Sequence, residues 1–187
     1  MALGGAMYTQ GQQAAVELAS ALEGGWRPDP MPASIALNAG ESLLVAVDFR
    51  LAEFSEQHVQ VSHSSLLAFG NPLFLVGSIA ASAALNAARN NAARRAAAPQ
   101  WRLVAHGVMH VTDLRLGLQT MLGWWDVAYP DIRSMICLDD GVAVFLDARP
   151  PLKLVVAWPE YLYVFLNFLA WQRIPRTEAL PAVVPPT

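Results

Sequence analysis

The spacing of apolar residues predicts a helix near each end of the chain. Residues 11–23 carry apolar side chains at helical spacing (Ala15, Leu18, Ala19 and Leu22), and Gly24-Gly25 provides the stop. Near the other end, Pro159 and Glu160 are suited to open a helix, and Tyr161–Trp171 is apolar at nearly every position. A helix that is apolar on all sides has to be covered on all sides. We therefore expect other elements, or another subunit, to pack around this terminal helix.

Between these helices the hydrophobic period changes to two, which is typical of strands. A β-rich region begins near Ile35, with strand-like runs at Glu41–Phe49 and Gln57–Ser62. Further runs follow at Trp101–Ala105, Val108–Thr112, Leu114–Thr120, Trp124–Tyr129, Ile132–Leu138, Val142–Leu146 and Leu152–Ala157. The sequence Asp139-Asp140-Gly141 suits a tight hairpin. Short strands in such succession favour a sandwich or barrel over alternating βα units.

A long uncharged stretch interrupts the strands. Ser64–Ala88 contains no charged residue, and Arg89, Arg94 and Arg95 follow it. From Leu73 to Ala98 alanine dominates and no proline intervenes, so the composition predicts a helix that ends at Pro99. The sequence thus predicts a long helical insertion at 63–100, between the second and third strands.

Two kinds of contact fit this insertion. Its apolar side chains can enter a membrane or pack on protein (Leu66, Leu67, Phe69, Leu73, Phe74, Leu75 and Val76), and its arginines Arg89, Arg94 and Arg95 can meet anionic head groups. Gly77 and Ala81 have the small-residue spacing that lets two helices approach closely. Because alanine is a poor lipid anchor, we favour protein packing for 80–98, and for 66–76 both contacts stay open.

Proline content marks the segments outside the β-rich region. Residues 26–32 contain three prolines and are expected to form an extended linker, and the tail at 174–187 contains four and is expected to be disordered. The predicted organisation is an N-terminal helix with a Pro-rich linker at 1–33, a β-rich domain at 34–173, and the tail.

Composition narrows the classes of function. Charged residues make up 14% of the chain, against about 25% in an ordinary soluble domain, so some apolar surface is expected to need a partner. The net charge of -3 offers no general attraction to nucleic acid. Cys137 is the single cysteine and excludes an internal disulfide, and the N-terminus lacks the pattern of a secretion signal, which together predict a cytoplasmic location. Abundant Ala and Arg with one Lys are typical of a GC-rich bacterial genome.

Few residues are candidates for chemistry. His106 and His110 with Asp113 suggest a metal site, but four residues of strand span about 13 Å, too far for one ion unless Gly107 bulges the strand. Asp139, Asp140 and Asp147 flank a hairpin without the spacing of an EF-hand. Cys137 has no patterned histidine partner and is interpreted as a small packed side chain. We therefore predict no catalytic residue, metal, cofactor or small-molecule substrate.

One stretch carries a family resemblance. Gly107-Val-Met-His-Val-Thr-Asp-Leu-Arg-Leu116 resembles the G-x-hydrophobic-x-hydrophobic-T-x-x-R-L signature of GRAM and bacterial PH-like domains. The likeness extends over 35–172, through Gly40-Glu41 before the first strand, Trp124–Tyr129 followed by Ile132, and the closing helix at 159–172. The helical insertion departs from the family pattern. The expected roles of the signature residues (Gly107, Thr112, Asp113, Arg115 and Leu116) are structural, with Thr and Asp bonding turn backbone and Arg pairing with an acid.

The resemblance implies a strongly bent sandwich of about seven strands, capped by a C-terminal helix and used to bind proteins, membranes or lipids. Together with the composition it predicts a non-enzymatic PH/GRAM-like adaptor or scaffold. Such a protein would form a homo-oligomer and bind a protein partner through the apolar helical surfaces. The first alternative is a peripheral membrane or lipid-binding protein at the inner face of the membrane, anchored by residues 64–98. The second is a metal-dependent enzyme, which requires folding to gather His106, His110 and Asp113 or Asp147.

Overall fold

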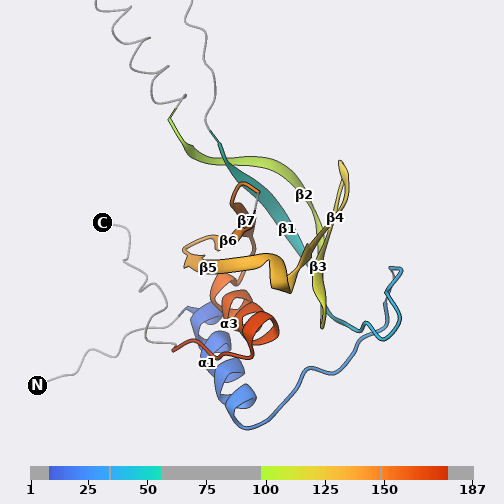
Figure 1. Ribbon diagram of the computed structural model, residues 1–187. Coiled ribbons are helices and arrows are strands. Elements are labelled where there is room, and N and C mark those ends of the chain that lie inside the picture. The colour runs from blue at the N-terminus through green and yellow to red at the C-terminus, as the bar shows by residue number, and fades with distance from the viewer. Residues whose placement is uncertain (1–8, 34, 56–97, 148, 177–187) are drawn as a thin grey trace, which may run out of the picture. The chain divides into compact units, whose positions relative to one another are not determined.

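The computed structural model describes residues 9–33, 35–55, 98–147 and 149–176. These residues form a mainly β structure with one seven-stranded antiparallel sheet and two α-helices (Figure 1). The elements are α1 (Gln10–Glu23), β1 (Leu43–Ser55), β2 (Gln100–Thr112), β3 (Arg115–Thr120), β4 (Gly123–Ala128), β5 (Ile132–Leu138), β6 (Gly141–Leu146), β7 (Leu152–Val155) and α3 (Pro159–Trp171). The strand order across the sheet is β4-β3-β2-β1-β7-β6-β5, so the first strand lies at the centre, between the second and the last.

Both predicted terminal helices are present. Thr9 and Gln12 form a capping box at the start of α1, in which each side chain bonds the backbone N–H of the other residue. The helix ends at Glu23 and is capped by Gly24, and Gly25 follows with a φ of 89° that glycine adopts easily. Pro159 occupies the first turn of α3, where its missing N–H costs nothing. Residues 26–32, predicted to form a linker, contain neither helix nor strand.

A single core joins the sheet to both helices. It contains inward-facing residues of all seven strands, and Figure 1 shows the sheet curving beside α3, with α1 packed against α3. The central side chains of α3 (Val164, Phe165 and Leu166) are almost fully buried. The expected covering of the terminal helix is therefore supplied by the sheet on one side and α1 on the other. Consequently α1 is part of the same core as the β-rich region.

The strand predictions from Leu114 onward are confirmed with small shifts at the ends. Two others are corrected. The first strand does not stop at Phe49 but continues to Ser55. Trp101–Ala105 and Val108–Thr112 are not two strands, because β2 runs without interruption through His106 and Gly107. Gly107 lies opposite Thr120 in the β2–β3 ladder. This glycine therefore allows the two strands to approach closely, and the chain does not turn there.

The predicted helical insertion lies almost wholly outside the described residues. Residues 1–54 and 101–187 form one compact unit, and residues 55–100 form another. The strands on either side of the insertion thus belong to one unit. Outside the described residues lie the predicted strand Gln57–Ser62 and all the insertion's predicted contact residues: Leu66, Leu67, Phe69, Leu73, Phe74, Leu75, Val76, Gly77, Ala81, Arg89, Arg94 and Arg95. The predicted C-terminal boundary of the insertion, residue 100, is corrected, because Gln100 is already the first residue of β2.

The tail prediction is corrected at its start. We expected disorder from residue 174, but Ile174 packs against the core. The reason is local: α3 ends at Trp171, and the left-handed backbone of the next residue, Gln172, turns the chain back toward the helix. The Arg173 N–H then donates to the Asn167 carbonyl. Residues 177–187 lie outside the described part of the chain.

Candidate functional site

The central strand β1 is much longer than its neighbour β7, and the mismatch opens the sheet. The two strands pair only from Arg50 opposite Val155 to Glu53 opposite Leu152. Beyond Val155 the chain leaves the sheet, the Val156 N–H donates to the Asp140 carbonyl at 3.3 Å, and α3 begins at Pro159. The first half of β1 therefore continues past the end of β7, with the start of α3 facing it.

The space between β1 and α3 is a groove of about 560 Å³. We call it the β1–α3 groove; its lining residues are Val45, Ala46, Val47, Asp48, Val156, Ala157, Trp158, Tyr161, Leu162 and Phe165. Asp48 is the one ionisable carboxylate in this lining, and the other side chains are apolar or aromatic. Trp158 is 50% exposed at the rim. A concave surface of this composition is suited to bind apolar groups.

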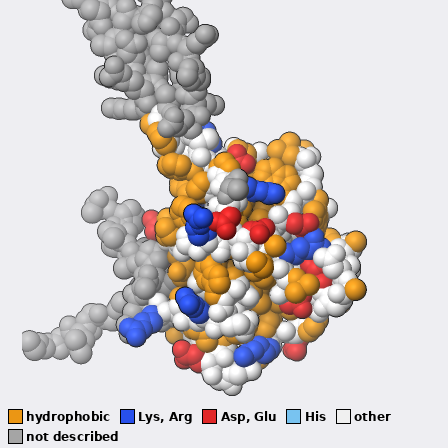
Figure 2. Space-filling model, in the orientation of Figure 1, with side chains coloured by type: hydrophobic (Ala, Val, Ile, Leu, Met, Phe, Trp, Pro, Cys, Tyr) orange, Lys and Arg blue, Asp and Glu red, His pale blue; other side chains and the backbone are white. Residues whose placement is uncertain are grey.

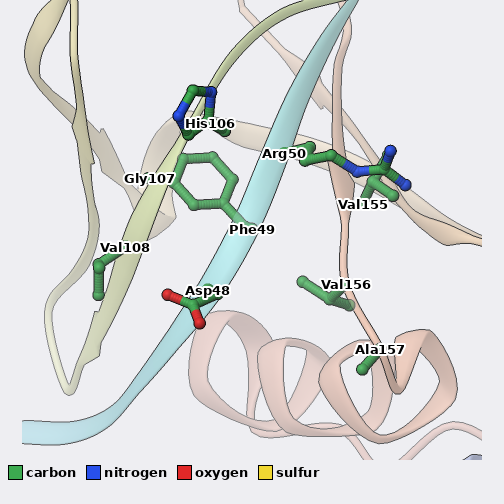
Figure 3. A pocket seen from close by; sticks show the side chains of 9 residues that line it. All are labelled: Asp48, Phe49, Arg50, His106, Gly107, Val108, Val155, Val156 and Ala157. Carbon is green, nitrogen blue, oxygen red and sulfur yellow. The ribbon is translucent and has the colours of Figure 1, made fainter.

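A second pocket of about 610 Å³ adjoins the groove. It shares Asp48, Val156 and Ala157 with the groove and adds residues of β2, including His106 (Figure 3). Figure 3 shows Val156 and Ala157 on the stretch between β7 and α3, across the pocket from Asp48 on β1. Arg50 also lines this pocket, so charged groups of both signs stand beside the apolar groove.

The residues of the metal hypothesis are not brought together in the described structure. His106 lines the second pocket, whereas His110 is buried, stacks on Trp124 with ring centroids 5.5 Å apart, and places Nε2 3.2 Å from Gln119 Oε1. Asp147 forms an ion pair with Arg133, and Asp140 with Lys153. Within residues 9–33, 35–55, 98–147 and 149–176 no group of three His, Cys, Asp or Glu side chains is placed to hold a metal ion.

Thr112 and Asp113 hold the turn between β2 and β3. The Thr112 hydroxyl donates to the Arg115 carbonyl at 2.9 Å and accepts from the backbone N–H groups of Leu114 and Arg115. Asp113 Oδ1 accepts from the Ser42 N–H at 2.9 Å, which ties the turn to the start of β1. The buried Tyr129 hydroxyl donates to the Thr112 carbonyl at 2.6 Å. These contacts are of the structural kind expected for this part of the signature.

Arg115 is the centre of an ionic cluster. Its Nε and Nη2 donate to the two carboxylate oxygens of Glu41 at 2.8 and 3.1 Å, and Nη1 lies 2.6 Å from Asp126 Oδ1. The Glu41 side chain is fully buried, and the hydrogen bond from Arg115 lowers its pKa from 4.5 to about 2. Leu116, the last signature residue, is a fully buried core residue. Glu41 was not singled out as a site residue from the sequence, although Gly40-Glu41 formed part of the resemblance.

Cys137 is half-buried beside the core, and its Sγ lies 3.9 Å from the Leu138 carbonyl oxygen. Burial, followed by the charges of Glu160 and Asp139, raises the thiol pKa from 9.0 to about 12. The reactive thiolate is therefore scarce near neutral pH.

We expect Cys137 to react with a disulfide reagent at about pH 8 roughly 1,000-fold more slowly in the folded chain than in guanidinium chloride. The reason is that the rise in its pKa lowers the thiolate fraction by about three orders of magnitude. Because Cys137 is the single cysteine, the absorbance of the released thiol reports this site alone. Equal rates in the two conditions would contradict the burial.

Sequence reasoning missed the β1–α3 groove. The alternation at Glu41–Phe49 and the helix from Pro159 were both visible, but the groove depends on where β7 stops pairing with β1. The lengths of the runs contained a usable signal: Leu152–Ala157 is short, and Pro159 follows it after one residue, so its strand cannot match a long partner.

No family model matches the sequence, and no curated protein matches it. Among solved structures, the chain is similar to the C-terminal domain of an unknown protein from Leishmania infantum, with 16% identity over 71% of this chain and 86% of that one and a TM-score of 0.38. No function is transferred at this level of similarity.

Proposed function

We propose that this protein is a non-enzymatic, PH/GRAM-like adaptor or scaffold that binds a protein partner. The fold part of the proposal is supported by seven strands followed by an apolar C-terminal helix, as the resemblance implies. The binding part rests on one observation: an open apolar groove lies between β1 and α3, in the same unit as the signature residues.

The lining of the groove favours a polypeptide over a small polar metabolite. Small-molecule sites use a few convergent polar groups to orient the ligand, whereas here Asp48 is the one charged side chain among ten lining residues. Exposed aromatic side chains such as Trp158 are typical anchors in protein interfaces. On the face shown in Figure 2, basic and acidic side chains are interspersed among hydrophobic ones. A surface with both signs of charge favours a protein as the binding partner over a nucleic acid.

The insertion supplies a second candidate contact for self-association or for an anionic membrane surface. Its residues lie outside the described part of the chain, so these two roles rest on the sequence pattern alone. Neither of the two described helices combines the length and hydropathy needed to cross a bilayer.

Placing a photo-crosslinking amino acid at position 158 tests the proposal. We expect irradiation of cells that naturally make this chain to join it to a discrete polypeptide, because residue 158 stands at the rim of the groove. The matched control is position 26, a tryptophan with similar exposure (44% against 50%) that does not line the groove. A product of twice the chain's mass would identify a second copy as the partner, and no product specific to position 158 would contradict the proposal.

A further inference from the structure

The backbone of β1 alternates regularly where it passes the groove. From Val45 to Leu51 the odd-numbered side chains are buried or half-buried and the even-numbered ones are exposed. An unbroken alternation of this kind shows that no bulge shifts the register over these residues. Residues of equal parity in this stretch therefore direct their backbone groups to the same neighbouring strand.

The ladder with β7 establishes which parity faces which neighbour. The Phe54 N–H donates to the Pro151 carbonyl at 3.4 Å, and the same register places Arg50 opposite Val155. Within residues 45–54, even-numbered residues of β1 thus direct their N–H and C=O groups toward β7, and odd-numbered residues direct theirs toward β2. Val155 is the last residue of β7. The next even-numbered residues of β1, Asp48 and Ala46, therefore direct their backbone N–H and C=O groups into the groove.

At Ala46 and Asp48 the backbone N–H and C=O groups of β1 form a free sheet edge. β2 is the neighbour of β1 on one side of the sheet, and on the other side the pairing with β7 begins only at Arg50, so among the described residues no strand pairs there with Ala46 or Asp48. Val45 and Val47 belong to the apolar lining together with Phe165. Backbone donors and acceptors beside an apolar floor select one kind of ligand, an extended chain whose side chains alternate.

We propose that the β1–α3 groove binds an extended segment of the partner protein, which adds to β1 as a strand opposite Ala46 and Asp48. This proposal rests on the proposed function and specifies its ligand. The segment carries apolar side chains at alternate positions, facing Val45 and Val47. A lysine or arginine in it is placed to pair with Asp48, the carboxylate of the groove.

The probe for this proposal is a random dodecapeptide library displayed on phage and selected on the full chain. The most enriched peptide is synthesised in three forms: unmodified, N-methylated at even positions, and N-methylated at odd positions. An added strand uses one edge for pairing, so we expect one methylated form to lose at least ~10-fold in affinity and the other to change by less than about 3-fold. Isothermal calorimetry measures all three.

Two variants of the chain complete the experiment. Ala46→Pro removes an N–H directed into the groove and is expected to weaken the unmodified peptide by ~10-fold while the thermal midpoint changes little. Ala46→Val is the matched control, because it changes the same side chain but keeps the N–H. Even if Ala46→Pro does not fold, the comparison of the two methylated peptides decides the matter alone.

The outcomes separate this inference from the proposed function. If the three peptide forms bind with equal affinity, and the unmodified peptide binds Ala46→Pro as tightly as the original chain, strand addition is overturned. The groove would then remain a protein-binding site. A library that yields no binder, together with a specific crosslink at position 158, would show that the partner is not an extended segment and would also overturn it. Absence of both would overturn the proposed function as well.

Discussion

Replacing Arg115 by Met is expected to lower the free energy of unfolding by about 3–5 kcal/mol. The substitution removes both hydrogen bonds to Glu41 and leaves a fully buried carboxylate without its cation. The desolvation cost of the Glu41 carboxylate is then no longer compensated, and this cost exceeds the net contribution of the Arg115–Glu41 pair. Urea denaturation followed by tryptophan fluorescence measures the loss.

The matched control is Arg133→Met. Arg133 and Asp147 form the same kind of ion pair, but their side chains are 75% and 60% exposed, so its loss should cost no more than about 1 kcal/mol. A comparable loss in both variants would contradict a special role of burial at Arg115.

The dependence on pH gives an independent readout for Arg115→Met. Because the folded-state pKa of Glu41 is depressed from 4.5 to about 2, its stabilising contribution is complete above pH 4.5 and disappears as the pH falls toward 2. In Arg115→Met the carboxyl loses this support and its pKa rises, so this component of the acid-dependent loss should be missing. If the two proteins lose stability equally between these pH values, Arg115 is not what depresses the Glu41 pKa.

Replacing Gly107 by Ala is expected to cost about 3 kcal/mol, at the upper end of the range for overpacking. An added Cβ would overlap the backbone carbonyl oxygen of Gln119, and it would also crowd the Cα of Thr120. Both neighbours are backbone atoms of the paired strand, so no side-chain rotation relieves the overlap. β2 and β3 would have to separate where they pair. The midpoint of thermal unfolding measures the effect.

Gly24→Ala serves as the comparison for Gly107→Ala. Gly24 lies at the end of α1 with an ordinary right-handed φ of -70°, and its nearest neighbours would be 3.3 Å from an added Cβ. This substitution should change stability by less than about 1 kcal/mol. A Gly107→Ala protein as stable as Gly24→Ala would show that the strands accommodate a methyl group there.

Much of the fold was predictable because its signals are local. The apolar spacing and glycines of α1, the proline at the start of α3 and the period-two alternation from Leu114 to Leu152 each depend on neighbours a few residues away. The same holds for Thr112, whose side chain bonds backbone within three residues. Two errors concern Phe49 and His106–Gly107, where a strand continues because another strand pairs with it: β7 beyond Phe49, and β3 at Gly107.

The sequence by itself determined the mainly β class, the positions of α1 and α3, and the structural character of the turn from Thr112 to Arg115. Tertiary structure alone decided that Glu41 is the acid that pairs with Arg115, and that β7 stops at Val155 while β1 runs on beside α3. The physical reason is that periodicity and capping are short-range properties, whereas strand register and the partner of a buried charge depend on which distant segments meet.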